Sequence, residues 1–436
     1  MSVTSTNRQM RFPRGARNEW PARQIDDGLN GAPTGRAQTA RNHPGPAGAL
    51  RALTGAAAPV FKSIAEALRW HDSDDPVFVL YPDKIATAAR SFLATNPGET
   101  LYAVKANPSP AILRMLWAEG VRRFDIASMR ELEFLKRTLP DAHLYLMHPV
   151  KSRRLIARSY ALGVRDYAFD SAEELEKIID ETGGAADLNL HLRLALPRTG
   201  AVMPLTGKFG AGAHEAVRLA ATARSVAKTL GVCFHVGSQC LDPGDYVRAI
   251  AHARRIVEDA GVAIDTLDVG GGFAVSYPGY TAPKINAYFE AIAAAMEANG
   301  LANVALLAEP GRALVAEGGS SLIRVELRKQ DALYLNDGAF GSLFDAAHFG
   351  WRYPTRLHRD ARSAGETDDG VNKHAFKLFG PTCDSEDAIR IPIELPEDIR
   401  EGDWIEFQHL GAYGQSLSAR FNGFYSETTV CVLDCA

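Results

Sequence analysis

Three residues with different chemistry, Lys105, His235 and Glu309, each stand in or just after a short apolar run. A lysine buried at such a position can lose its proton and form a Schiff base with an aldehyde. A carboxylate that faces a pyridine nitrogen holds that nitrogen protonated, so the ring accepts electrons more readily. Taken singly, His235 is typical of a satisfied interior histidine and Glu309 of an exposed charge in a turn.

Glycine-rich turns accompany these residues. The triplet Gly270–Gly272 follows one apolar run, and Gly311 precedes Arg312 after another. Such turns let backbone amides approach a phosphate closely, and the N-terminus of a following helix adds positive potential. A glycine triplet alone is more typical of a tight turn. The combination of a lysine, a histidine, a glutamate, an arginine and these turns predicts a site for pyridoxal phosphate.

The elements that must position these residues alternate between short apolar runs and helical stretches from about residue 76 onward. Runs of this kind are typical of strands buried on both faces of a parallel sheet. Eight strand–helix units in succession predict an α/β fold with a closed (β/α)₈ TIM barrel, and an open doubly wound sheet is the alternative. The predicted strands are 101–107, 123–128, 143–149, 166–171, 188–194, 232–238, 267–273 and 304–312.

Most of the unusual polar residues fall at the C-terminal ends of these strands, where barrel enzymes carry their catalytic groups. They are Lys105, Asp125, Arg193, His235, Ser238, Gly270–Gly272, Glu309, Gly311 and Arg312. Two helix starts carry serines, Ser128 and Ser171, each followed three residues later by a glutamate, Glu131 and Glu174. This spacing predicts capping boxes.

The pattern changes after about residue 316. The segments SLIRVELRKQ, ALYLNDG, DWIEFQHL and TTVCVLD alternate apolar and polar residues, which is typical of antiparallel strands with one covered face. We predict a barrel over residues 84–316, a C-terminal antiparallel β-domain over 317–436, and a segment, 58–83, that joins the β-domain. Residues 1–57 hold eight arginines against three acidic residues and few large apolar ones, which predicts a disordered tail, with a transit peptide as the alternative.

Composition narrows the class of protein. A chain of 436 residues with 46% hydrophobic and 23% charged residues is typical of a globular protein of two domains. The net charge of −4 gives no case for nucleic acid binding. No apolar run is long enough to span a membrane, no secretory signal is visible, and the five scattered cysteines form neither a disulfide framework nor a metal site. We therefore expect a cytoplasmic protein without a metal.

The residues resemble those of a known family. In family order, the chain carries motifs similar to those of the barrel-type (alanine racemase-like, fold type III) pyridoxal phosphate decarboxylases, most of all ornithine decarboxylase. The motifs are Tyr102–Asn107, Phe124–Ser128, Lys208–Gly210, His235–Ser238, Asp268–Phe273, Glu309–Arg312, Asn336–Gly338, Gly380–Asp384, Gly411–Tyr413 and Phe421–Phe424. They cover roughly residues 76 to 430, and their common order makes the match specific.

This resemblance implies roles for individual residues. Lys105 would bind the cofactor covalently, His235 would stack on its ring and Glu309 would pair with the ring nitrogen. Phosphate binding is implied for Ser238, Gly272, Gly311, Arg312 and Tyr413, and support of the pocket for Asp125, Glu131 and Arg193. Cys383 would act as a proton donor after carbon dioxide leaves, and Asp384 would bind the distal amine of the substrate. Both come from the neighbouring subunit in the family, which implies a homodimer with shared sites, and Lys208 matches a lysine near that interface.

The preferred substrate is less closely defined by the motifs. Cys383 followed by Asp384 resembles ornithine and lysine decarboxylases, so L-ornithine is expected first and L-lysine second. The chain departs from the family after Asn336–Gly338, because Phe349 stands where the family carries an acidic residue aimed at the distal amine. Asp345 lies about one turn earlier, and we take both positions as candidates for contact with the substrate.

Alternatives remain open. The same segment carries Trp351, Arg352 and Arg356. An arginine there could receive a distal carboxylate, as in diaminopimelate decarboxylases, although surface charges are the simpler interpretation. A siderophore-pathway amino acid is a further candidate substrate. A non-catalytic regulator of polyamine metabolism is the alternative from another class, but such a protein would be expected to have lost Lys105, Glu309 or Cys383.

Overall fold

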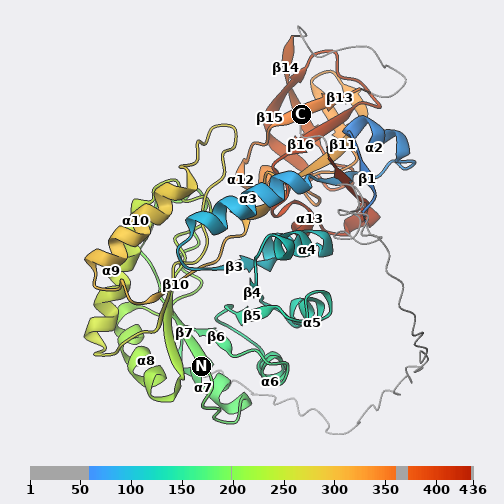
Figure 1. Cartoon of the computed structure of the whole chain (residues 1–436). Coiled ribbons are helices and arrows are strands. Elements are labelled where there is room, and N and C mark those ends of the chain that lie inside the picture. Colours follow the sequence, from blue (N-terminus) through green and yellow to red (C-terminus); the bar gives the residue numbers. More distant parts are fainter. Residues whose placement is uncertain (1–57, 198, 360–371, 434–436) are drawn as a thin grey trace, which may run out of the picture. The chain divides into compact units, whose positions relative to one another are not determined.

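The computed structural model describes residues 58–197, 199–359 and 372–433 (Figure 1). The tail predicted over residues 1–57 lies outside the described residues. All eight predicted barrel strands are present, every neighbouring pair is parallel, and they close in the order β10-β3-β4-β5-β6-β7-β8-β9. The predicted barrel is therefore confirmed, and the open sheet is wrong. The strands are β3 (Glu99–Ala103), β4 (Arg123–Asp125), β5 (His143–Leu146), β6 (Asp166–Phe169), β7 (Asn189–Arg193), β8 (Thr229–Cys233), β9 (Thr266–Asp268) and β10 (Ala305–Ala308).

Helices cover the outside of the barrel. They are α3 (Pro82–Thr95), α4 (Pro110–Ala118), α5 (Met129–Thr138), α6 (Arg153–Ala161), α7 (Ala172–Glu181), α8 (Ala213–Val226), α9 (Gly244–Asp259) and α10 (Ile285–Ala298). Only a short helix, α11 (Arg312–Val315), follows β10, so α3 packs between α10 and α4 instead. Ile85, Ala89 and Phe92 lie on one face of α3 at helical spacing and are buried, which explains how a helix that precedes the barrel can complete it.

The second sheet contains nine strands from both ends of the chain, in the order β1-β17-β2-β11-β12-β14-β15, with β16 joining β11 to β13. They are β1 (Val60–Phe61), β2 (Val77–Leu80), β11 (Gly319–Lys329), β12 (Ala332–Leu335), β13 (Thr355–His358), β14 (Lys373–Phe379), β15 (Ala388–Pro396), β16 (Trp404–Gln408) and β17 (Thr429–Val432). The sheet is largely antiparallel, as predicted. Three pairs are parallel, however: β17 with β1, β17 with β2, and β12 with β14. The expectation of an antiparallel arrangement is therefore wrong for the segment TTVCVLD.

Three further short helices are α2 (Ile64–Trp70), α12 (Phe344–Phe349) and α13 (Gly414–Leu417). A 3₁₀ turn follows β3 at Val104–Ala106, and another lies at Phe421–Gly423. The two sheets are connected by backbone contacts beside the barrel mouth. The amide of Tyr413 donates to the carbonyl of Ala106 at 2.8 Å, and the side chain of Asn107 donates to the carbonyl of Gly411 at 2.9 Å. These bonds place Tyr413 beside the 3₁₀ turn Val104–Ala106, which follows β3 and carries Lys105. In the described part of the chain, no helix combines the length and the apolar character that a membrane span requires.

Both predicted helix caps form through serine, but the glutamates behave differently from a capping box. The hydroxyl oxygens of Ser128 and Ser171 accept from the amides of Glu131 and Glu174. The carboxylate of Glu131 accepts from Ala127, one residue before the cap. The carboxylate of Glu174 instead pairs with Lys151 on another loop. The prediction of a reciprocal box at Ser171 is therefore wrong, because a buried lysine takes the glutamate.

Candidate active site

A small pocket at the C-terminal mouth of the barrel brings together eight of the ten residues predicted to bind the cofactor. Its volume is about 50 Å³. Because the parallel strands all end at this mouth, lining residues from Ala103 to Arg312 meet here, and Tyr413 joins them from the segment after β16. The lining residues are Ala103, Lys105, Leu205, His235, Ser238, Gly271, Gly272, Phe273, Glu309, Gly311, Arg312 and Tyr413. The other two predicted residues, Asp125 and Arg193, end the neighbouring strands β4 and β7.

Lys105 forms an ion pair with Asp125, with 3.9 Å between Nζ and Oδ2. The lysine side chain is 52% exposed, whereas that of Asp125 is 7% exposed, so the expectation of a buried lysine is wrong in this structure. Partial desolvation lowers the pKa of Lys105, but Asp125, Tyr413 and Glu309 together raise it above its usual range. In the cofactor-free protein, Lys105 therefore holds its proton.

Glu309 and Asp125 form part of a buried acidic group in the barrel mouth. Burial, together with the nearby Asp268, raises the pKa of Glu309 to about 8. Burial and Glu309 raise the pKa of Asp125 to about 8. Like charges that share a poorly solvated site cannot all ionise, so a proton is retained among these carboxyls near neutral pH. Such a carboxylic acid can donate a hydrogen bond or hand its proton to a basic nitrogen.

His235 is held as a neutral imidazole. Its Nδ1 accepts a hydrogen bond from the amide of Gly237 at 3.0 Å, so the ring proton lies on Nε2. Burial, Arg193 and Lys105 all lower the pKa of His235 well below its usual range. A neutral ring can stack on another aromatic ring without carrying a buried charge.

At two of the predicted glycines, Gly272 and Gly311, a side chain would collide with neighbouring atoms. A Cβ atom on Gly272, whose φ is +104°, would lie 2.4 Å from the carbonyl oxygen of Gly237. A Cβ atom on Gly311 would lie 2.9 Å from that of Ala106. The backbone can therefore line this part of the pocket closely only with glycine at both positions.

Arg312 is the buried cation of the pocket, with 5% of its side chain exposed. Its Nη1 donates to the hydroxyl of Tyr277 at 3.2 Å, and its guanidinium carbon lies 4.8 Å from the ring of Trp351 and 4.9 Å from that of Tyr413. Asp345 lies 3.6 Å from Nη2, and its side chain is also 5% exposed. Arg312 therefore has cation–π contacts and a carboxylate, but its Nε lacks a hydrogen-bond partner among the described residues.

The predicted substrate residues are not gathered in this pocket. Cys383 and Asp384 lie exposed on the loop between β14 and β15, and the Sγ of Cys383 donates to Oδ1 of Asn422 at 3.5 Å. The side chain of Phe349, at the end of α12, is 56% exposed. Asp345, four residues earlier on the same helix, faces Arg312 and is buried. The structure thus separates Asp345 and Phe349 onto a buried and an exposed side of α12.

Sequence reasoning missed several residues around the pocket. Tyr277 and Trp351 contact Arg312, and the turn at Gly350 brings Trp351 back toward α12, since its amide donates to the carbonyl of Asp345 at 3.3 Å. Gly350 has a φ of +66°, as expected of a glycine that ends a helix. The glycine between Phe349 and Trp351 could have predicted this turn. No residue in the segment indicates, however, that Trp351 contacts Arg312 of α11.

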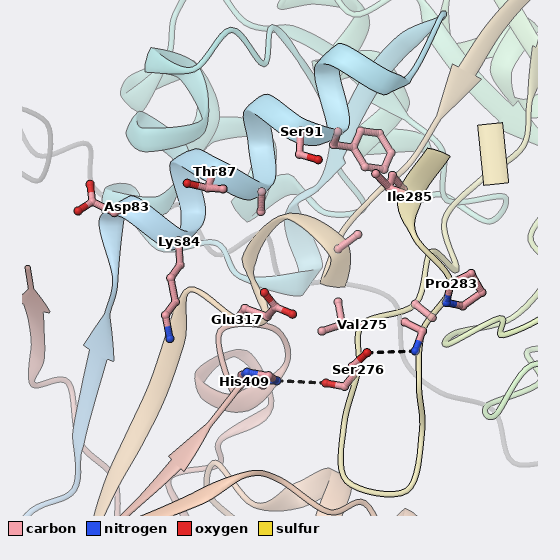
Figure 2. Close-up of a pocket in the computed structure, with 15 residues that line it drawn as sticks. Asp83, Lys84, Thr87, Ser91, Val275, Ser276, Pro283, Ile285, Glu317 and His409 are labelled. Carbon is pink, nitrogen blue, oxygen red and sulfur yellow. Dashed lines mark hydrogen bonds between the residues drawn. The ribbon is translucent and has the colours of Figure 1, made fainter. Parts of the chain in front are cut away.

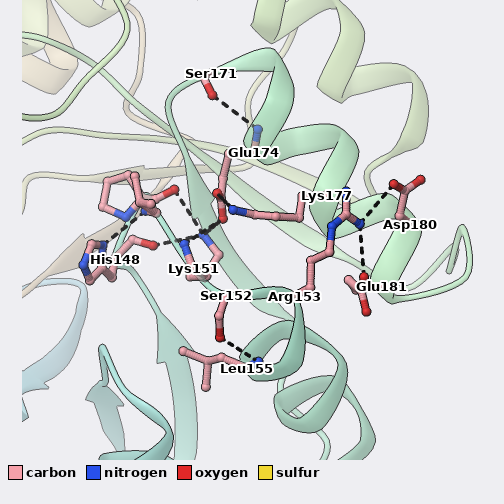
Figure 3. Close-up of polar contacts among 12 residues, drawn as sticks. His148, Lys151, Ser152, Arg153, Leu155, Ser171, Glu174, Lys177, Asp180 and Glu181 are labelled. Carbon is pink, nitrogen blue, oxygen red and sulfur yellow. Dashed lines mark hydrogen bonds and ion pairs between the residues drawn. The ribbon is translucent and has the colours of Figure 1, made fainter. Parts of the chain in front are cut away.

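A buried network supports the mouth on the side of β5 and β6 (Figure 3). The fully buried ammonium of Lys151 donates to the carbonyls of His148, at 2.9 Å, and of Ala168, and pairs with Glu174 at 2.9 Å. Burial lowers the pKa of Lys151 to about 8. The amide of Met147, just before His148, donates to the carboxylate of Asp125 at 3.3 Å. The network therefore fixes the loop that contacts Asp125.

A larger cleft of about 600 Å³ lies between α3, the loop after β9 and residues Glu317 and His409 (Figure 2). The Nδ1 of His409 donates to the carbonyl of Ser276 at 3.2 Å at its edge. None of the residues predicted to bind the cofactor or the substrate lines this cleft. Its size alone assigns it no part in the chemistry.

Comparison with known proteins gives a consistent result. Residues 83–316 match the family model described as pyridoxal-dependent decarboxylase, pyridoxal binding domain. The chain is 32% identical over 348 residues to the lysine/ornithine decarboxylase of Selenomonas ruminantium, which covers 76% of this chain and 83% of that protein. It is also 32% identical over 379 residues to antizyme inhibitor 2 of Xenopus laevis, covering 80% and 79%. The structure resembles that of the lysine/ornithine decarboxylase of Vibrio vulnificus complexed with putrescine, with a TM-score of 0.71, 30% identity and coverage of 86% and 99%.

Proposed function

The chain belongs to the family of pyridoxal-dependent decarboxylases that act on basic amino acids, and we propose that it converts L-ornithine to putrescine, with L-lysine as its second substrate. The observation that carries the proposal is the meeting of Lys105, His235, Glu309 and Arg312 in one pocket. Each has the chemistry that one part of pyridoxal phosphate requires: an amine for the aldehyde, a flat neutral ring, an acid for the nitrogen and a cation for the phosphate.

The pocket residues fit this cofactor. The Nε of Arg312 is buried and without a hydrogen-bond partner among the described atoms, so the pocket offers a donor that an anion can take up. Gly272 and Gly311 leave backbone exposed beside it, and a methyl group on either would collide with a neighbour. Ser238 and Tyr413 add hydroxyl groups to the lining. This is a donor set suited to a phosphate, with Lys105 and Glu309 in the same pocket.

Pyridoxal phosphate, when bound, supplies an aldehyde for the substrate amine and an electron sink for the carbanion that decarboxylation leaves. Lys105 is the amine in the pocket that can hold the aldehyde, and Asp125, 3.9 Å away, can take up the proton that this lysine must lose. Glu309 belongs to the buried acidic group that retains a proton, and it could give this proton to a pyridine nitrogen. Neutral His235, in the same pocket, could stack on the ring without adding charge. The charge of Arg193 acts to lower the pKa of both Glu309 and His235.

Cys383 and Asp384 have the chemistry for the remaining steps: a thiol that can deliver a proton to carbon and a carboxylate that can bind a distal ammonium. Both are exposed, as are the rings of Phe421, Phe424 and Tyr425, which are 43%, 49% and 41% exposed. Exposed aromatic residues beside reactive groups are typical of a surface that a second subunit covers. We therefore propose a homodimer in which Cys383 and Asp384 of one subunit complete the pocket of the other.

The shared site can be tested by mixing two inactive proteins. Lys105→Ala removes the amine of one half of the site, and Cys383→Ala removes the thiol of the other. Subunits that exchange will form mixed dimers with one intact site, so activity should return on mixing. Two variants that stay inactive together, although gel filtration shows a mixed dimer, would mean that each chain builds its own site.

The choice of a basic amino acid rests on Asp384, and ornithine is placed before lysine because the motifs resemble ornithine decarboxylase most. Asp345 is buried beside the charge of Arg312, and Phe349 has no charge to offer. A single carboxylate at Asp384 can pair with the distal ammonium of ornithine or of lysine, which differ by one methylene group. Lysine is kept second because one methylene changes binding by only about 1 to 3 kcal/mol.

Product analysis tests the substrate. The purified protein with cofactor is incubated with L-ornithine, L-lysine or meso-diaminopimelate, and diamines are quantified. Asp384→Ala should lower kcat/KM for ornithine by about 30-fold or more, corresponding to about 2 kcal/mol for a lost charged partner. Glu386→Ala is the matched control, since that exposed carboxylate pairs with exposed Arg390 and should leave kcat/KM unchanged. Absence of any diamine from protein with bound cofactor would contradict the assignment to a basic amino acid.

One specific observation favours each of two other functions. Arg352 is exposed after α12, close in sequence to the position where the family carries an acid, and could receive a substrate carboxylate. Consumption of meso-diaminopimelate alone would establish that alternative.

The similarity to an antizyme inhibitor suggests a non-catalytic role as the other alternative. The retention of Lys105, Glu309 and Cys383 argues against that role. Release of carbon dioxide from any of the three amino acids would exclude it.

A further inference from the structure

Arg312 and Asp345 form a buried pair of unusual geometry. Each side chain is 5% exposed, and Nη2 of Arg312 lies 3.6 Å from Oδ2 of Asp345. That distance permits an ion pair but is too long for a hydrogen bond. Both the Oδ2 of Asp345 and the Nε of Arg312 lack a hydrogen-bond partner in the described part of the chain. The carboxylate therefore acts on the arginine through its charge more than through directed bonding.

Other groups fix the orientation of Arg312. The hydroxyl of Tyr277 accepts from Nη1 at 3.2 Å. The rings of Trp351, Tyr413 and Tyr277 lie 4.8, 4.9 and 5.8 Å from the guanidinium carbon. Guanidinium groups stack well on aromatic rings, so these contacts hold the plane of the arginine without any help from Asp345.

The unsatisfied edge of the guanidinium is the one that an oxyanion would use. Nε and Nη2 lie on the same edge, and together they can donate two parallel hydrogen bonds to a phosphate or a carboxylate. Asp345 lies near this edge but does not form those bonds. A buried negative charge close to a phosphate lowers the affinity of the site for it, since like charges repel strongly where water is scarce.

We propose that Asp345 is a residue that weakens and thereby tunes phosphate binding at Arg312, and that it takes no part in binding the substrate amine. The inference rests on the proposed function, because it assumes that the pocket takes pyridoxal phosphate. The carboxylate balances the charge of Arg312 when no phosphate is present and opposes the phosphate when it binds. Its removal therefore strengthens binding of the phosphorylated cofactor, whereas loss of the Tyr277 hydroxyl weakens it.

The test compares pyridoxal 5′-phosphate with pyridoxal, which lacks the phosphate. The full-length chain is freed of cofactor by dialysis, and binding of each aldehyde is followed by its visible absorbance and by quenching of tryptophan fluorescence. Asp345→Asn should lower the Kd for pyridoxal phosphate by about tenfold and leave the Kd for pyridoxal within about twofold, because only the phosphate meets the removed charge. Tyr277→Phe keeps the ring but loses the acceptor of Nη1, and should raise the Kd for pyridoxal phosphate alone.

The outcomes separate the two claims. If the wild-type protein binds neither aldehyde, the proposed function fails. The second case is a wild-type protein that binds both aldehydes. If Asp345→Asn then keeps the wild-type ratio of the two Kd values, or loses affinity for pyridoxal phosphate, the inference about Asp345 is overturned and the proposed function stands. Asp345→Ser, which removes the charge and adds no bulk, provides the same comparison should the asparagine variant fail to fold.

Discussion

Substitution of Gly272 by alanine should damage the pocket through the backbone alone. Gly272 has a φ of +104°, and a Cβ atom there would lie 2.4 Å from the carbonyl oxygen of Gly237 and 3.0 Å from Cγ2 of Val236. Forcing a residue with a side chain into such a backbone conformation costs about 1 to 3 kcal/mol. Overlap with packed atoms costs a further 1 to 3 kcal/mol, roughly, because a backbone carbonyl cannot swing aside as a flexible side chain can. We therefore expect Gly272→Ala to lower the free energy of unfolding by about 2 to 6 kcal/mol.

Gly279 provides a matched control. Its φ is +90°, but no atom lies within 4 Å of the position that a Cβ would take. Gly279→Ala should therefore cost only the conformational part, about 1 to 2 kcal/mol. Urea unfolding of both variants, followed by circular dichroism, measures the difference. A cost at Gly272 no larger than that at Gly279 would refute the steric part of the reasoning, since the contact with Gly237 would then be able to relax.

Three further predictions concern charge. Lys151→Met should lower the free energy of unfolding by about 3 kcal/mol, because it leaves Glu174 and three carbonyls short of a buried donor. Lys377→Met, which removes only an exposed pair with Asp331, should cost below about 1 kcal/mol in the same urea titration. Because the pKa of Glu309 is raised to about 8, its carboxyl keeps a proton in the folded state at pH values where the unfolded chain has lost it. The stability of the cofactor-free protein should therefore fall as pH rises from about 4 to 8. Glu309→Gln should make the thermal unfolding temperature depend less on pH over this range. Burial raises the pKa of Asp166, but hydrogen bonds from two histidines outweigh this effect and lower the pKa to about 2. The stability that ionised Asp166 gives the folded protein should therefore be lost as pH falls from about 4 to 2. Acid titration of Asp166→Asn should not show this loss.

The barrel was predictable because its physical signal is strong and local. Strands buried on both faces need continuous apolar runs, and those runs, such as Leu101–Val104, are visible without knowledge of their neighbours. The residues at the strand ends were predictable for the same reason: once the barrel closes, Lys105, His235 and Glu309 must share one mouth. The parallel pairs of the second sheet were missed. Val430, Cys431 and Val432 form a continuous buried run, but a run of three residues does not indicate in which direction the neighbouring strands lie.

Two polar residues show where sequence reasoning fails. Glu174 has the spacing of a capping box after Ser171, but the spacing carries no information about Lys151, which approaches from a different loop. Asp345 is acidic and close to the position where the family carries a substrate-binding acid, yet it lies on the buried side of α12 beside Arg312. In both cases a long-range charge partner decides the role of the carboxylate, and no local pattern encodes that partner.

The strands that pair in the second sheet are synthesised at widely separated times. Strand β2 lies between β11 and β17, and its Phe78 pairs with Thr429, which is made 351 residues later. At a translation rate of about 5 to 20 residues per second, the apolar strand Val77–Leu80 waits between about 20 and 70 s for its last neighbour. The barrel, whose strands all fall between Glu99 and Ala308, can close during that interval. A nascent chain can therefore carry a closed barrel joined to a sheet in which the edge of β2 stays unpaired until Thr429–Val432 has been made.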